Sequence, residues 1–229
     1  MTLPRLLALL LLAIACAHAL MPQERESGAV RDLLTAAVER SVARLGREGG
    51  FAEEPAARID LALRLGPLGR ALHGLGMGTR VALLEAALER ASERVTAELG
   101  PWLGEEAARF APEAPDSVLR DPPGAAALAF RAAVEPDLAA RLRPAAERAV
   151  EDAGVAAAIA RVSEGGSRLP LPREVALDPV ALVSERVRAA FFTLLVEEET
   201  ALRASAAAAA EGFPPTSGDP GAGERAGRR

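Results

Sequence analysis

The chain is poor in the residues that most binding and catalytic sites use. Aromatic residues make up 3% of it, there is one cysteine, there are two histidines, and lysine, asparagine and tyrosine are absent. A single cysteine excludes a disulfide within the chain. With His18 and His73 as the available imidazoles, familiar hydrolase and zinc chemistries are not predicted. His73 is interpreted as a histidine at a helix end, and no metal site or cofactor is expected.

Charge is the next feature, and it is balanced. Arginine supplies all the basic side chains, and the formal net charge of −5 is spread along the 229 residues. Proteins that bind nucleic acid concentrate positive charge along the phosphate backbone and offer aromatic rings to the bases. Neither pattern is present here, so nucleic-acid binding is not predicted.

What the chain has in abundance is alanine, leucine and arginine, which favour helix. No segment shows the two-residue period of a strand, and no repeat of constant period occurs. The sequence therefore predicts an all-α fold, a single-domain bundle of roughly six to eight helices over residues 27–210, with a long and largely enclosed C-terminal helix. Residues 211–229, rich in proline and glycine, are predicted to be a disordered tail.

The N-terminus has the features of an export signal. Arg5 precedes an apolar run from Leu6 to Ala15, and small residues follow. That run is too short to span a bilayer, and no later segment is apolar over the length that a spanning helix needs. We expect an exported, periplasmic protein with no transmembrane helix in the mature chain.

Two processing sites fit this leader. Cleavage after Ala17-His18-Ala19 would remove residues 1–19 and release a soluble chain beginning at Leu20. Alternatively, Ala13-Ile14-Ala15-Cys16 is a lipobox, so that residues 1–15 are removed and Cys16 is lipidated. Membrane contact is expected in the second case alone.

Helix boundaries follow from glycine and proline. Ser27 is predicted to cap a first helix that ends at Gly46, followed by a turn-rich connector to Asp60. A short helix is expected from Gly66 to Leu75. The long helix that follows is expected to stop at Pro101, with a separate piece to Phe110. Further helices are predicted at the ranges 124–134, 137–153 as a bent continuation, 155–163 and 179–210.

A set of landmark residues occurs in a distinctive order along the chain. The landmarks are Gly50-Phe51, Pro55-Ala56, Arg58-Ile59, Gly76-Met77-Gly78, Glu85, Arg90-Ala91, Glu93, Phe130-Arg131, Leu138, Pro144, Gly154-Val155, Phe192-Thr193-Leu194, Glu197-Glu198-Glu199 and Arg203. In this order the chain resembles the domain-of-unknown-function 4197 family of exported bacterial proteins, from Arg58 to Val155 and from Val183 to Arg203. That family has no assigned chemistry, so the resemblance implies fold and compartment rather than activity.

The chain also departs from that family. Alanines stand at 127, 129 and 133, where relatives have threonines and a tyrosine around the Phe-Arg pair. Ala189-Ala190 replaces an Asp-Gly, and polyalanine replaces a final Pro-Ala-Ala-Arg segment. The chain resembles a divergent member in which a shared polar site is thinned out.

Two groups of carboxylates are candidates for a site. Glu85, Glu89 and Glu93 recur every four residues, and helical angles predict a mostly solvated ladder with Glu85 nearest the buried face. Glu198 falls on the apolar stripe of the last helix, so it needs a partner. We predict a buried cluster in which Glu198 pairs with Arg131 or Arg90. The full candidate set is Arg58, Glu85, Arg90, Glu93, Arg131 and Glu198.

Three functions fit these features. The first is a non-enzymatic binding or structural module of the cell envelope, with a partner protein or a small ligand. The second is an enzyme or small-ligand binder that uses the Glu/Arg cluster, which a deep pocket lined by Arg131 and Glu198 would favour. The third is a carrier of an apolar ligand, which an uncharged cavity would favour.

Overall fold

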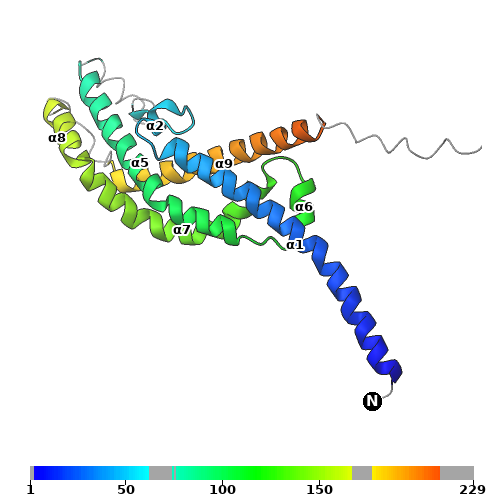
Figure 1. The fold of residues 1–229 in the computed structure, drawn as a ribbon. Coiled ribbons are helices and arrows are strands. Elements are labelled where there is room, and N and C mark those ends of the chain that lie inside the picture. The colour runs from blue at the N-terminus through cyan, green and yellow to red at the C-terminus, as the bar shows by residue number, and fades with distance from the viewer. Residues whose placement is uncertain (1–2, 62–73, 75, 167–176, 212–229) are drawn as a thin grey trace, which may run out of the picture.

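The computed structural model describes residues 3–61, 74, 76–166 and 177–211, and within these ranges the surroundings of side chains from 24 to 164 and from 177 to 209. These residues form seven helices and no strand (Figure 1), which confirms the predicted all-α fold. The helices are α1 (Leu3–Leu45), α2 (Gly50–Glu53), α5 (Gly78–Arg109), α6 (Pro115–Arg120), α7 (Ala125–Asp152), α8 (Val155–Gly166) and α9 (Pro179–Glu211).

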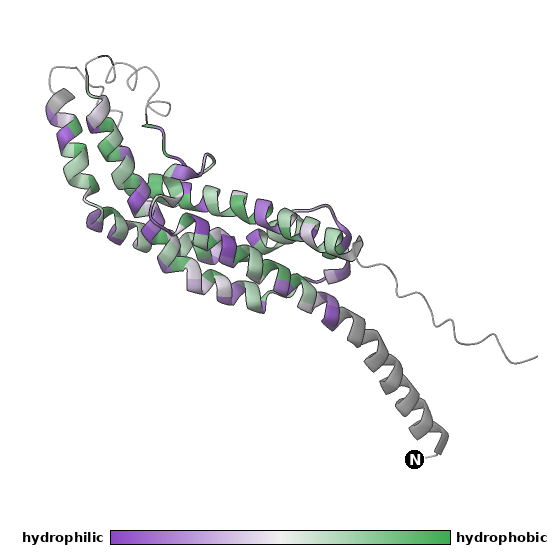
Figure 2. Ribbon diagram, turned by 45° about the horizontal axis from the view of Figure 1, so that its top comes forward, coloured by the Kyte–Doolittle hydropathy of each residue, from purple (hydrophilic) through white to green (hydrophobic). Residues whose placement is uncertain are grey.

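Four long helices build the bundle. The C-terminal half of α1 packs on α5 and α9, and α7 packs on α5 and α9 from the other side. Along each of these helices hydrophobic positions alternate with hydrophilic ones (Figure 2), as expected for helices with one face turned inward. The core is aliphatic and alanine-rich, with three fully buried phenylalanines, Phe51, Phe130 and Phe191.

Helix α5 does not stop at Pro101, so the predicted break there was wrong. Proline removes one backbone donor, which normally ends or kinks a helix. Here Leu99, Leu103 and Ala107 are buried on both sides of the proline. Burial of apolar side chains against neighbouring helices offsets the missing hydrogen bond, and the helix continues to Arg109.

The backbones of α1 and α5 lie close together at Gly100. A Cβ atom at Gly100 would lie 2.6 Å from Cγ1 of Val42. The backbones can approach at this point because position 100 carries no side chain.

Other boundaries also differ from expectation. Helix α1 begins at Leu3, so Ser27 lies inside it and does not cap it. Residues 3–20 are rich in leucine and alanine, and these residues extend the helix. The predicted helix 124–134 and its bent continuation 137–153 form one helix, α7, which contains Pro136 and Pro144. Helix α6, a single short helix after Ala114, was not predicted. The short helix expected from Gly66 to Leu75, with His73, lies largely outside the described residues.

The enclosed C-terminal helix is confirmed. Phe191, Phe192, Leu194 and Leu195 are buried, while Thr193 faces solvent. Helix α9 contacts α1, α5 and α7, so most of its circumference is covered by protein. In the described part of the chain, no helix combines the length and hydrophobicity that a membrane crossing requires.

Candidate functional site

The acidic ladder of α5 holds the connector that follows α1. The carboxylate of Glu85 accepts a hydrogen bond from the backbone N–H of Leu61 at 2.8 Å, and Glu93 accepts one from Phe51 at 3.4 Å. Glu93 is 7% exposed, and Glu85 and Glu89 are half-buried. The prediction of a mostly solvated ladder was therefore wrong. Helical angles alone omitted the connector that lies across this face.

Two of these carboxylates hold protons more tightly than usual. Burial raises the pKa of Glu93, and the hydrogen bonds from the amides of Phe51 and Gly49 offset this only in part. Burial also raises the pKa of Glu89, again against a smaller opposing effect from the Ile59 amide. Backbone amides are dipoles and not cations, so they compensate a buried negative charge incompletely.

Glu198 lies at the other side of the same connector. It accepts a hydrogen bond from Arg44 of α1 at 2.6 Å and lies 3.8 Å from Arg40. Arg44 also bonds to Glu54 in the connector. Glu198 does need an arginine, but the predicted partners were wrong, because its face of α9 packs on α1 and not on α7.

The predicted cluster is thus only partly assembled. Glu85 and Glu93 accept hydrogen bonds from backbone amides of the segment after α1. Glu198 is linked to this segment through Arg44, which also bonds to Glu54. The carbonyl of Arg58 in the same segment accepts a hydrogen bond from Arg186 of α9. The side chain of Arg90 is exposed. Arg131 is exposed on α7, where it bonds to Glu135 at 2.9 Å. The six residues therefore do not form one buried cluster.

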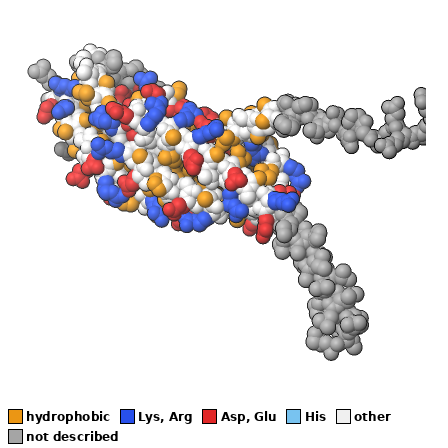
Figure 3. Space-filling model, viewed as in Figure 1, with side chains coloured by type: hydrophobic (Ala, Val, Ile, Leu, Met, Phe, Trp, Pro, Cys, Tyr) orange, Lys and Arg blue, Asp and Glu red, His pale blue; other side chains and the backbone are white. Residues whose placement is uncertain are grey.

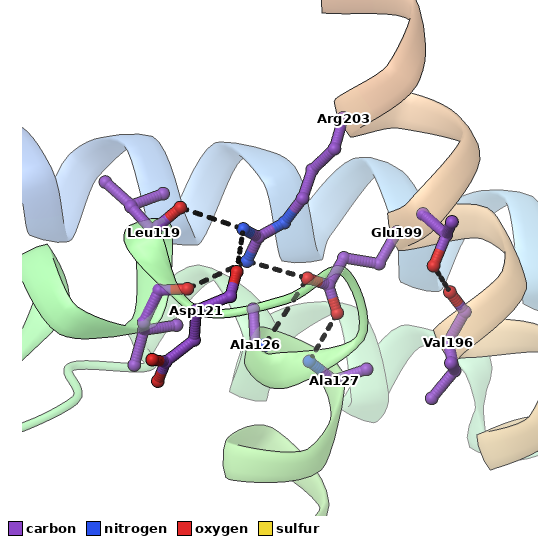
Figure 4. Close-up of polar contacts among 9 residues, drawn as sticks. Leu119, Asp121, Ala126, Ala127, Val196, Glu199 and Arg203 are labelled. Carbon is purple, nitrogen blue, oxygen red and sulfur yellow. Dashed lines mark hydrogen bonds and ion pairs between the residues drawn. The ribbon is translucent and has the colours of Figure 1, made fainter.

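The most buried charge in the described residues was missed by the sequence prediction. Glu199 is fully buried and pairs with Arg203, one turn further along α9, at 2.8 Å. Its two oxygens also accept hydrogen bonds from the amides of Ala127 at 2.8 Å and Ala126 at 3.4 Å (Figure 4). These amides belong to the first turn of α7, where the helix dipole favours a negative charge.

Arg203 completes this junction from the cationic side. Its guanidinium donates to the carbonyls of Val118 and Leu119 at 2.9 Å each, and to Asp121 at 3.3 Å (Figure 4). These carbonyls are at the C-terminal end of α6, where the helix dipole favours a positive charge. The Glu199–Arg203 pair therefore links the C-terminal end of α6 and the first turn of α7 to α9.

The available sequence signal for this pair was its spacing. Glu199 and Arg203 are four residues apart, as are Leu195 and Glu199. The prediction used one narrow stripe on α9, whereas Leu194 and Leu195 are both fully buried. On such a wide buried face Glu198 and Glu199 lie at its two edges, toward α1 and α7 respectively.

A groove of about 500 Å³ lies between α7 and α9. At one end Arg131 and Arg188 both bond to Glu135, at 2.9 and 2.7 Å. The guanidinium of Arg131 also lies over the ring of Phe192, 5.0 Å from its centroid. The groove is lined by Ala127, Leu128, Arg131, Arg188, Ala189, Phe192, Thr193, Val196 and Glu197.

Glu135, at the polar end of this groove, keeps its negative charge. Burial raises the pKa of Glu135, but the hydrogen bonds from Arg188 and Arg131 outweigh it, so that the pKa is below its ordinary value. On the face shown in Figure 3, acidic and basic side chains are interspersed and there is no broad area of one sign. No group of three or more potential metal ligands occurs among the described residues.

The fold and the site together define a helical bundle whose buried carboxylates are bonded to its own backbone and arginines, and which presents a partly charged groove on one side. A family model described as a protein of unknown function (DUF4197) matches residues 21–212. The chain belongs to this family. No curated protein and no solved structure matches it.

Proposed function

We propose that this protein is a non-enzymatic binding module of the cell envelope, and that the groove between α7 and α9 is its binding surface. The sequence supports export through the leader, with Cys16 lipidation or cleavage before Leu20 as the two processing routes. The groove supports binding. Its volume of about 500 Å³ is in the range of small-molecule pockets.

The observation that carries this proposal is the contrast between the groove and the buried acids. Glu85, Glu93, Glu198 and Glu199 are bonded at separate places to backbone amides or arginines of the fold. Groups used in this way hold the structure together. In the groove, by contrast, Arg131, Arg188 and the apolar side chain of Leu128 face solvent, as at a site that accepts a ligand.

The two alternative functions have less support. An enzyme or small-ligand binder that uses the Glu/Arg cluster would need Arg131 and Glu198 in one deep pocket. Glu198 instead bonds to α1, and Arg131 lines the open groove. The carrier reading requires an apolar cavity. The apolar cavity between Leu99, Leu138 and Phe191 measures about 10 Å³, which is no more than the space one water molecule needs.

The test is site-specific crosslinking in the native cells. A photo-crosslinking residue replaces Thr193, which is exposed and lines the groove, and a matched control replaces Arg143, which is exposed on α7 outside it. We expect adducts in the envelope fraction from position 193 and not from position 143. Equal adducts from both positions, or a full-length chain with its leader in the cytoplasm, would contradict the proposal.

A further inference from the structure

The groove has a polar end at which two guanidinium groups bond to one carboxylate. Two guanidinium groups, Arg131 and Arg188, share the single carboxylate of Glu135. Their bonds to Glu135 use Nε of Arg131 and one Nη of Arg188, and a guanidinium has five N–H donors. Both side chains are partly exposed, so their remaining donors can reach a second anion that enters from the groove.

Next to this polar end the wall is apolar. Phe192 lies directly under Arg131, and Val196, one turn further along α9, approaches Gly124 at the start of α7. On the α7 side Leu128 is 59% exposed, which is unusual for a large apolar residue in this protein. An apolar chain laid along this wall would remove the Leu128 side chain from water, which is favourable.

The two ends of the groove differ in charge, so a charged ligand would have a preferred orientation in it. The helices α7 and α9 are antiparallel here, because Glu135 meets Arg188 while Ala127 meets Glu199. The arginines therefore lie at one end of the groove, and the exposed Glu197 lies at the opposite end. A negatively charged head is attracted to the first end and repelled from the second.

We propose that the groove binds a single-chain amphiphile with a carboxylate head, the head between Arg131 and Arg188 and the chain along Phe192 and Leu128. The proposal rests on the binding function assigned to the groove above and adds the class of ligand. Arginine binds a carboxylate through two parallel N–H bonds, and the guanidinium of Arg131 lies over the ring of Phe192 at the same end of the groove.

The experiment is calorimetric titration of the protein, purified from its own cells and washed free of small molecules. The probes are laurate, dodecanol and dodecyltrimethylammonium, each below its aggregation concentration. We expect laurate to bind, and Arg131→Gln to weaken it at least about tenfold, as for loss of a charge-assisted hydrogen bond. The cationic probe should bind at least about tenfold more weakly than laurate.

The matched control is Arg143→Gln. Arg143 bonds to Glu147 through Nε at 3.1 Å on the same helix, with the same four-residue spacing as Arg131 and Glu135, but outside the groove. It should leave laurate affinity unchanged. A second variant, Ala189→Leu, fills the groove without removing a charge and should reduce binding of laurate and dodecanol together.

Two results would overturn the proposal. The first is no binding of laurate, and the second is an equal loss of laurate affinity in Arg131→Gln and Arg143→Gln. If laurate does not bind and Leu128→Glu disrupts a homodimer, the groove belongs to a second copy of the chain. If dodecanol binds as well as laurate and Ala189→Leu blocks both, the anionic head is wrong but the groove is still a binding surface.

Discussion

Carboxylates are held in two different ways on the two sides of this bundle. Next to the connector, Glu93 and Glu89 are bonded to backbone amides, and burial raises the pKa of both. On the side of α7, Glu199 and Glu135 are bonded to arginines, and the pKa of Glu135 is lowered even though burial opposes it. A glutamate charge is therefore disfavoured by burial in the first region and favoured by an arginine partner in the second.

The difference shows what a cation adds to a buried acid. An amide donor satisfies a lone pair but brings no net charge, so the buried carboxylate is still under-compensated. A guanidinium supplies both the donor and the charge. The two regions should consequently respond in opposite directions when the charge is removed, and three substitutions test this.

The largest effect is expected for Glu199→Ala. It leaves Arg203 without its carboxylate and removes the acceptor of the Ala126 and Ala127 amides. Breaking a buried pair in this way costs roughly 3 to 5 kcal/mol. We expect the free energy of unfolding in urea to fall by about 3 kcal/mol.

The control for Glu199→Ala is Glu147→Ala on α7. Glu147 also pairs with an arginine four residues away, but its side chain is 52% exposed. Exposed pairs of this kind contribute about 0.5 kcal/mol or less. If both alanine variants lose the same stability, burial is not what makes the Glu199 pair strong.

A smaller effect of opposite sign is expected for Glu93→Gln. The amide side chain keeps an acceptor for Phe51 and carries no charge, so it should raise the free energy of unfolding at neutral pH, by on the order of 1 kcal/mol. Because the folded-state pKa of Glu93 is above the ordinary value of 4.5, its contribution is present below that pH and is lost as pH rises.

The pH dependence makes this prediction specific. Urea unfolding of both proteins across pH should show Glu93→Gln gaining on the parent as pH rises above about 4.5. A variant that is less stable than the parent at neutral pH would mean that the amides of Gly49 and Phe51 compensate the charge in full.

The smallest effect is expected for Glu135→Gln. The side chain of Glu135 is 30% exposed, so solvent screens its bonds to Arg131 and Arg188, and the loss at neutral pH should be about 1 kcal/mol or less. Since its pKa is lowered, its contribution is present above the ordinary value and is lost as pH falls through the folded-state pKa. The parent and the variant should therefore converge at acid pH in thermal unfolding. Glu93→Gln should also converge with the parent there, but from the opposite side, since that variant is the more stable protein at neutral pH.

Most of the fold was predictable because it depends on local preference. Alanine and leucine dominate every long segment, and the C-terminal helix was predicted within one residue, at 179–210 against Pro179–Glu211. The errors were the break at Pro101, the start of the first helix and the missing α6. Pro101 lies inside α5 because neighbouring helices bury the residues on either side, and such burial cannot be inferred from adjacent residues alone.

The candidate site was less predictable. The sequence correctly indicated that Glu198 needs an arginine, but Arg44 lies 154 residues away along the chain. Helical angle gives the direction of a side chain on its own helix and not the identity of the helix that it faces. The ladder was misassigned for the same reason, since the connector that covers Glu93 comes from another part of the chain.

The amino-acid sequence by itself determined the helical class, the long final helix and the family, because helix propensity and spacing are properties of neighbouring residues. Tertiary structure alone decided that Glu93 lies under the Phe51 amide, that Glu199 rather than Glu198 is fully buried, and that Arg131 and Arg188 share Glu135 at the edge of a groove. Each of these facts depends on which helices meet, and the energy of a charge depends on what surrounds it.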